Sequence, residues 1–96
     1  MVKVPIDVTE LTFTIASISK LGARRISEDE VSEIPWNRYS TAQNHRTPVP
    51  GRRLLVGLTN GGRCLTIVIE PTDDPTTWTV ITGWESTDRE RKIVES

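Results

Sequence analysis

The sequence predicts an α+β domain of 96 residues, in which helices pack against an antiparallel sheet. Three β-rich segments, 53–59, 63–70 and 78–84, are separated by turn sequences. Two helical patterns precede these segments and a short one follows them. We therefore expect N-terminal helices, a three-stranded antiparallel meander and a short C-terminal helix.

The N-terminal helices are predicted from periodicity and from a capping box. Residues 13–25 place apolar side chains at helical spacing, although alternation near the start leaves the first helical residue open. Ser27 and Glu30 have capping-box spacing, in which each side chain accepts a hydrogen bond from the other residue's backbone N–H. The second helix is expected to stop before Pro35, because proline disfavours helical backbone in the residue before it.

The meander is predicted from its turn and from its side-chain pattern. Asn60-Gly61-Gly62 is a strong hairpin signal, because both glycines tolerate positive φ. The central strand, 63–70, carries apolar residues on both faces and should be covered on both sides. Thr87 and Glu90 form a second capping box, which opens the C-terminal helix.

Two segments are predicted to lie outside the helices and the meander. Residues 1–12 alternate in polarity and contain Pro5, a pattern that favours an edge strand or an extended arm. Residues 35–51 are rich in proline and polar residues, and we expect a long basic loop there. Long connections in compact domains tend to be functional or disordered. Residues 1–96 are thus predicted to form a single domain.

Charge is distributed unevenly along the chain. The formal net charge is -1, yet no acidic residue lies between Glu33 and Glu70. The arginines of this stretch are Arg38, Arg46, Arg52, Arg53 and Arg63. Such a patch can bind phosphates through charge-assisted, often bidentate hydrogen bonds. The alternative interpretation is a solvated face with flexible arginines.

The 35–51 loop also interleaves aromatic residues with arginines. Trp36 and Tyr39 lie beside Arg38, and His45 lies beside Arg46. This composition is typical of sites for single-stranded nucleic acid, where bases stack and phosphates pair. An ordinary mobile loop with Trp36 tucked beneath it is the alternative.

Several other kinds of site find no support in the sequence. The single histidine and single cysteine lack metal-ligand spacing, and no phosphate-binding glycine loop precedes a helix, so no cofactor is expected. Cys64 cannot form an intramolecular disulfide and is expected to be a buried thiol. No signal peptide or apolar run of membrane-spanning length is present, so we expect a cytoplasmic protein without membrane contact.

Three motifs resemble those of BrnT-type toxins. Residues 23–31 resemble the "KHGVSFEEA"-like segment of that family. Residues 53–70, with the hairpin GLTNGGR, resemble its "IGxTxxGRxLxVV" strands, and residues 81–91 resemble its "ISARxATxxER" ending. The similarity spans about residues 13–93. It implies a RelE-like ribonuclease toxin of a type II toxin–antitoxin pair, which needs no metal and is neutralised by a cognate antitoxin.

A set of site residues follows from the resemblance and from the basic middle of the chain. RNA carries its own nucleophile in the 2′-hydroxyl, so arginines that hold the phosphate and stabilise developing charge can support cleavage. The residues assigned to catalysis are Arg53, Arg63, Glu90 and Arg91. Those assigned to RNA binding are Arg24, Arg38, Arg46, Arg52 and Trp84.

Some of these assignments have alternatives. Glu90 would orient an arginine or act as base, and helix capping is its other role. Arg24 stands where the family often has histidine, and Trp84 stands where it has arginine. Trp84 could stack a base, belong to the core or face the antitoxin. The resemblance also allows a homodimer or a toxin–antitoxin hetero-oligomer.

A second class of function stays open, a non-catalytic interaction module of the same fold that binds a protein partner or nucleic acid. The position of three arginines separates the two hypotheses. Convergence of Arg53, Arg63 and Arg91 on one cleft would favour an enzyme, because a scissile phosphate must be held from several sides. Scattering of these side chains would favour a binding module.

Overall fold

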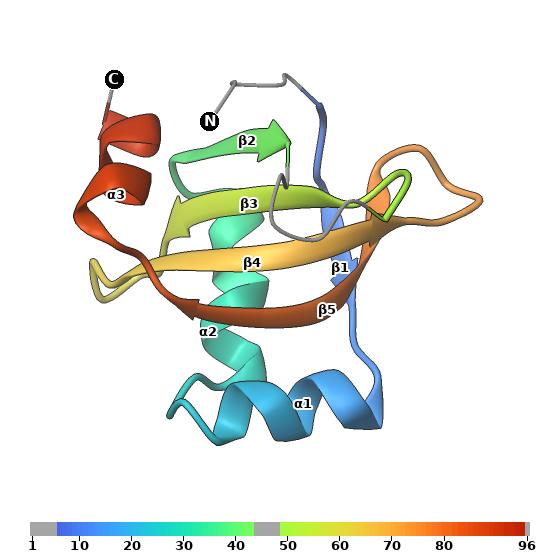
Figure 1. Ribbon diagram of the computed structural model, residues 1–96, viewed down its shortest axis with the longest axis horizontal. Helices are drawn as coiled ribbons and strands as arrows, with labels where there is room; N and C mark the ends of the chain where they lie inside the picture. The colour runs from blue at the N-terminus through green and yellow to red at the C-terminus, as the bar shows by residue number, and fades with distance from the viewer. Residues whose placement is uncertain (1–5, 44–48, 96) are drawn as a thin grey trace.

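A computed structural model describes residues 6–43 and 49–95 and confirms the α+β class. One five-stranded mixed sheet has the strand order β1-β5-β4-β3-β2 (Figure 1). The elements, in chain order, are β1 (Glu10–Thr12), α1 (Ile15–Gly22), α2 (Glu28–Glu33), the 3-10 helix η1 (Ile34–Trp36), β2 (Tyr39–Gln43), β3 (Arg53–Leu58), β4 (Cys64–Pro71), β5 (Thr77–Glu85) and α3 (Asp88–Glu95).

The prediction of N-terminal helices followed by a three-stranded meander is wrong. Strands β3, β4 and β5 do pair antiparallel as neighbours, but β1 adds parallel to β5 and β2 adds antiparallel to β3. A strand therefore comes before the first helix. Both added strands are short. Strand β1 pairs with β5, which is distant in sequence, and β2 pairs with β3, the next strand along the chain. Strand β1 lies within residues 1–12, for which an edge strand was one of the two predicted forms, whereas β2 lies within the predicted loop 35–51. Local side-chain patterns do not report which strands pair.

The segment 35–51 is not one long loop. It begins within η1 and then forms β2, in which Ser40, Thr41 and Ala42 are buried. Pairing with β3 satisfies the backbone groups on one side of β2, so the polar composition of Ser40 and Thr41 does not prevent strand formation. Residues 44–48, with His45 and Arg46, lie outside the described residues.

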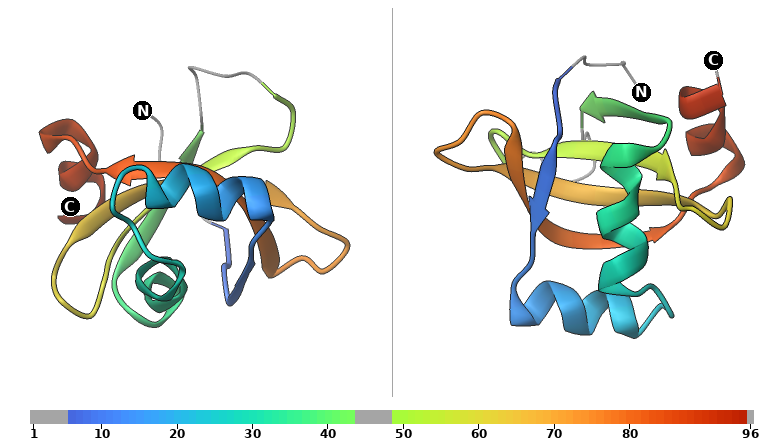
Figure 2. Two further views of the ribbon diagram at one scale, coloured as in Figure 1. Left: turned by 90° about the horizontal axis from the view of Figure 1, so that it is seen from below. Right: turned by 180° about the vertical axis from the view of Figure 1, so that it is seen from behind.

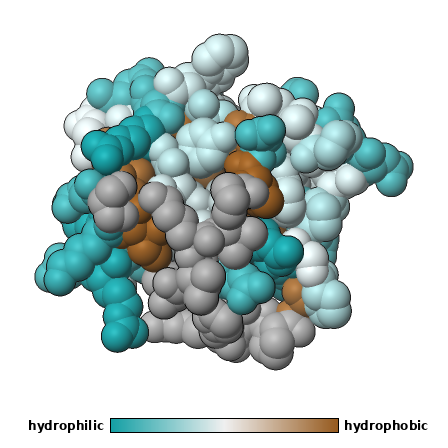
Figure 3. Space-filling model, turned by 90° about the horizontal axis from the view of Figure 1, so that it is seen from above, coloured by the Kyte–Doolittle hydropathy of each residue, from teal (hydrophilic) through white to brown (hydrophobic). Residues whose placement is uncertain are grey.

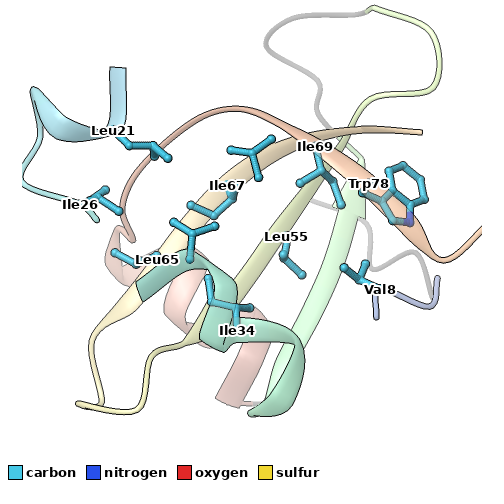
Figure 4. Packing of buried hydrophobic residues seen from close by; sticks show 11 residues of the cluster. Val8, Leu21, Ile26, Ile34, Leu55, Leu65, Ile67, Ile69 and Trp78 are labelled. Atoms are coloured by element: carbon cyan, nitrogen blue, oxygen red, sulfur yellow. The ribbon is translucent and has the colours of Figure 1, made fainter. Parts of the chain in front are cut away.

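The two faces of the sheet are covered by different helices. Helices α1 and α2 lie on one face, called the α1–α2 face here, and α3 lies over one end of the other face, called the α3 face (Figure 2). Residues Leu21 and Ile34 point from the helical side into the main core (Figure 4). The strand residues of this core are Leu55, Leu65, Ile67, Ile69, Trp78 and Val80.

The α3 face has two smaller clusters. Val94 of α3 packs with Val56 and with the buried free thiol of Cys64, as predicted for that cysteine. The other cluster has Trp84 and Ile81 packed against its buried members, Ala42, Leu54 and Val68. The central strand β4 is therefore buried on both sides, as predicted. In the described part of the chain, every helix is too short or too polar to span a bilayer.

Candidate functional site

Arg53 and Arg63 lie at opposite ends of the β3–β4 ladder. Arg53 is in register with Ile69, and at the other end Leu58 is in register with Cys64, which follows Arg63. At about 3.3 Å per residue, the Cα atoms of Arg53 and Arg63 are roughly 20 Å apart along the sheet. One phosphate group cannot contact both side chains.

Arg63 is held on the α1–α2 face by two carboxylates. Its Nε donates to Glu85 at 3.1 Å, and its Nη1 donates to Glu30 at 3.2 Å and to the carbonyl of Arg25 at 2.9 Å. The hydrogen bond to Glu85 is the main cause that raises the pKa of Arg63. This side chain joins the β3–β4 hairpin to α2 and β5, and a phosphate would have to displace those partners.

Arg52 and Arg53 are also engaged within the fold. Arg52 Nε forms an ion pair with Glu70 at 3.3 Å, across the β3–β4 ladder. Arg53 Nη1 donates to the carbonyl of Arg52 at 3.0 Å. Its Nε atom is buried and has no hydrogen-bond partner among the described residues. Both side chains are partly exposed, but each has at least one guanidinium N–H group bonded within the fold.

Glu90 is the partner of Trp84. The carboxylate of Glu90 accepts hydrogen bonds from the indole Nε1 of Trp84 at 3.0 Å and from the backbone N–H of Thr87 at 2.9 Å. The residue is 5% exposed. The capping box predicted at Thr87 and Glu90 is therefore confirmed, and the capping role of Glu90 is the one the geometry explains.

Arg91 is the predicted catalytic residue that is most accessible. It lies exposed on α3, with Arg89 and Lys92. The face of the molecule that is seen from above carries hydrophilic residues with hydrophobic ones between them (Figure 3). Arg38 approaches the same helix and donates from Nη2 to the carbonyl of Glu95 at 3.2 Å. Because Arg63 binds α2 on the other face of the sheet, Arg53, Arg63 and Arg91 do not converge.

Arg24 borders a basic hollow next to β5. Its Nη1 donates to the carbonyl of Gly83 at 2.9 Å and to the hydroxyl of Thr82 at 3.2 Å. Lys20, Ala23, Arg24 and Thr82 line an open hollow of about 580 Å³. The remaining guanidinium N–H groups and the ammonium of Lys20 could bind an anion there.

A second hollow contains an aromatic residue that was absent from the predicted site residues. Trp36 is 86% exposed and is not tucked beneath a loop. It lines an open hollow of about 450 Å³, called the Trp36 hollow here, together with Thr9, Glu10, Leu11, Ser32 and Pro35. In a 3-10 helix the third residue does not share the direction of the first, so burial of Ile34 turns Trp36 outward. The sequence signal was a tryptophan after proline in a polar segment.

No group of acidic, histidine or cysteine side chains in residues 6–43 and 49–95 could hold a metal ion. Comparisons with models of protein families, with curated proteins and with solved structures each returned no match. The resemblance to BrnT-type toxins therefore stays a prediction.

Proposed function

We propose that this chain is a non-catalytic interaction module that binds a protein partner through the surface around Trp36. The observation that carries the proposal is the exposure of this indole, of which 86% is accessible to solvent. Tryptophan is enriched among the residues that dominate binding energy at interfaces. Burial of such an indole removes roughly 150 Å² or more from water, which stabilises a complex by about 4 kcal/mol before other costs.

The arrangement of the arginines supports binding rather than catalysis. Arg53 and Arg63 lie far apart, and Arg91 lies on the other side of the sheet from Arg63. Arg63 and Arg52 are neutralised by Glu30, Glu85 and Glu70. A ribonuclease of this kind would need several free cations around one phosphate.

The proposal can be tested with a photo-reactive amino acid placed at position 36 in the cells that make the protein. Asp73, which is exposed on the turn between β4 and β5, is the matched control position. We expect one discrete protein adduct from position 36 and none from position 73, while the purified chain leaves single-stranded RNA intact. Equal labelling at both positions, or RNA cleavage lost on an Arg91→Ala change, would contradict the proposal.

A growth-inhibiting toxin that contacts RNA and is neutralised by a cognate antitoxin is the second candidate function. The observation that favours it is the basic hollow at Lys20 and Arg24, together with the exposed Arg91. In this case, expression of the chain alone slows bacterial growth, and well-folded Arg24→Ala and Arg91→Ala variants relieve the inhibition. Normal growth with the unchanged chain would remove this candidate.

A further inference from the structure

The Trp36 hollow lies between the edge of the sheet and helix α2. On one side stands β1, the edge strand, which has β5 as its single neighbour in the sheet. On the other side stand α2 and η1, and β1 runs beside α2 on the α1–α2 face (Figure 2). The hollow is thus a groove with one strand wall, from Thr9 to Leu11, and one helical wall, from Ser32 to Trp36.

The strand wall can accept a further strand. An edge strand presents backbone N–H and C=O groups that have no partner within the sheet. Extended peptides are recognised by adding to such edges, with side-chain pockets giving the specificity. Because the groove is open beside β1, an occupant with extended backbone suits it better than a helix.

The charge of the groove selects the side chains of its occupant. Glu10 is exposed, and its carboxylate forms no ion pair with any residue that the structure describes. None of the described residues that line the hollow is basic. A polyanion such as RNA would be repelled here, and a cationic side chain would be attracted.

Besides negative charge, the hollow offers an arginine or a lysine side chain the aromatic face of Trp36. A guanidinium or ammonium group placed over an indole face is attracted by the ring electrons. Glu10 and Trp36 both line the hollow, Glu10 from its strand wall and Trp36 from its helical wall. Pro35 and Leu11 add apolar surface for the stem of such a side chain.

We propose that the Trp36 hollow binds an extended, arginine- or lysine-bearing segment of a partner protein, which adds beside β1 and places its cation between Trp36 and Glu10. This inference rests on the proposed function and names the chemistry of the partner. It does not require RNA or a second copy of this chain.

A random octapeptide library displayed on phage and selected on the folded chain tests this inference. We expect enriched peptides to carry arginine or lysine at one fixed position, and Trp36→Ala to weaken their binding by about tenfold or more. Glu10→Lys should reverse the preference toward acidic peptides. Glu28→Lys is the matched control, because it makes the same charge change on α2 outside the lining of the hollow, and it should leave the preference unchanged.

Several outcomes would overturn the inference. They are a lack of enrichment, enrichment without a basic residue, or equal effects of Glu10→Lys and Glu28→Lys. Tighter binding of a pyrimidine oligonucleotide, with loss in Trp36→Ala, would assign the hollow to nucleic acid. Sedimentation that shows a dimer disrupted by Trp36→Ala would assign it to a second copy. A protein adduct at position 36 without a basic-peptide preference would leave the proposed function standing and remove this inference alone.

Discussion

Glu90 and Trp84, which are six residues apart, are joined by a hydrogen bond of 3.0 Å from the indole Nε1 to the carboxylate. The same carboxylate accepts the backbone N–H of Thr87 at 2.9 Å. Sequence analysis assigns Glu90 to catalysis and Trp84 to RNA binding, but in the structure these two side chains are hydrogen-bonded to each other. Their contact fixes the first turn of α3 against the end of β5.

The Glu90→Ala change should lower the free energy of unfolding by about 2 kcal/mol, because two N–H donors lose their acceptor. Urea denaturation measures this change. Glu95→Ala is the control, since Glu95 is exposed on the same helix, and its effect should stay within about 0.5 kcal/mol. Equal effects of the two changes would show that the contact between Glu90 and Trp84 contributes little.

The contact between Arg63 and Glu30 predicts a stability that depends on pH. The hydrogen bond from the Ser27 backbone, and then the bond from Arg63, lower the pKa of Glu30 below its ordinary value of 4.5. A carboxylate whose pKa is lower in the folded state stabilises the fold above its unfolded pKa. That contribution is lost as the pH falls through the folded pKa.

We therefore expect Glu30→Gln to lower the free energy of unfolding by about 1 kcal/mol at neutral pH, since the pair is partly exposed. The difference between parent and variant should shrink once the pH falls below about 4.5. Urea denaturation at a series of pH values measures it. A difference that stays constant into the acid range would mean that ionisation of Glu30 does not contribute.

Sequence patterns predicted the parts of the fold that depend on neighbouring residues. Both capping boxes, at Ser27 and Thr87, join residues three positions apart, and their side chains contact as predicted. The partners of Arg63 include Glu30, which is 33 residues away, and no local pattern reports that contact. For the same reason the sequence motif and the basic middle of the chain predict a phosphate ligand at Arg63, whereas the structure pairs this residue with two carboxylates.

Strand β2 and the Trp36 hollow could not be predicted for similar reasons, and the sequence left β1 open between an edge strand and an extended arm. β1 pairs with β5 across a separation of 67 residues, as in the contact of Thr12 with Thr79. The outward position of Trp36 depends on Ile34 docking into a core assembled from distant strands. A tryptophan in the sequence is more simply assigned to a core, so its exposure could be learned from the structure alone.

Gly57 lies where β3 meets η1 and β2, and it should not tolerate a side chain. A Cβ atom built there would overlap Cγ2 of Ile34 and lie 2.9 Å from Cβ of Tyr39. Gly57→Ala should therefore lower the free energy of unfolding by about 2 kcal/mol or more. Gly61→Ala is the control, because the nearest atom to a Cβ there is Thr59 Oγ1 at 3.8 Å. Thermal unfolding measures both variants, and the midpoint temperature should change little for Gly61→Ala. A stable Gly57→Ala variant would show that η1 can move away from the sheet.

Arg25 ends helix α1 in a left-handed conformation, with φ of 59°. The backbone N–H of Ile26 donates to the carbonyl of Leu21, and the N–H of Arg25 donates to that of Gly22, each at 3.0 Å. These are the two hydrogen bonds of a Schellman motif, and the buried pair of Leu21 and Ile26 supplies its hydrophobic contact. The position of Arg25 in this motif is normally occupied by glycine.

Arg25→Gly should raise the free energy of unfolding by about 1 kcal/mol, because a left-handed conformation costs a side-chain-bearing residue that much or more. The backbone carbonyl that accepts from Arg63 is retained in the variant. Ala23→Gly is the matched control, since its φ of -62° is helical and glycine should lower stability there by about 0.5–1 kcal/mol. Urea denaturation of both variants measures the two changes in the free energy of unfolding, which should have opposite signs. A loss of stability in Arg25→Gly would mean that the guanidinium of Arg25 stabilises the fold by more than its backbone strain costs.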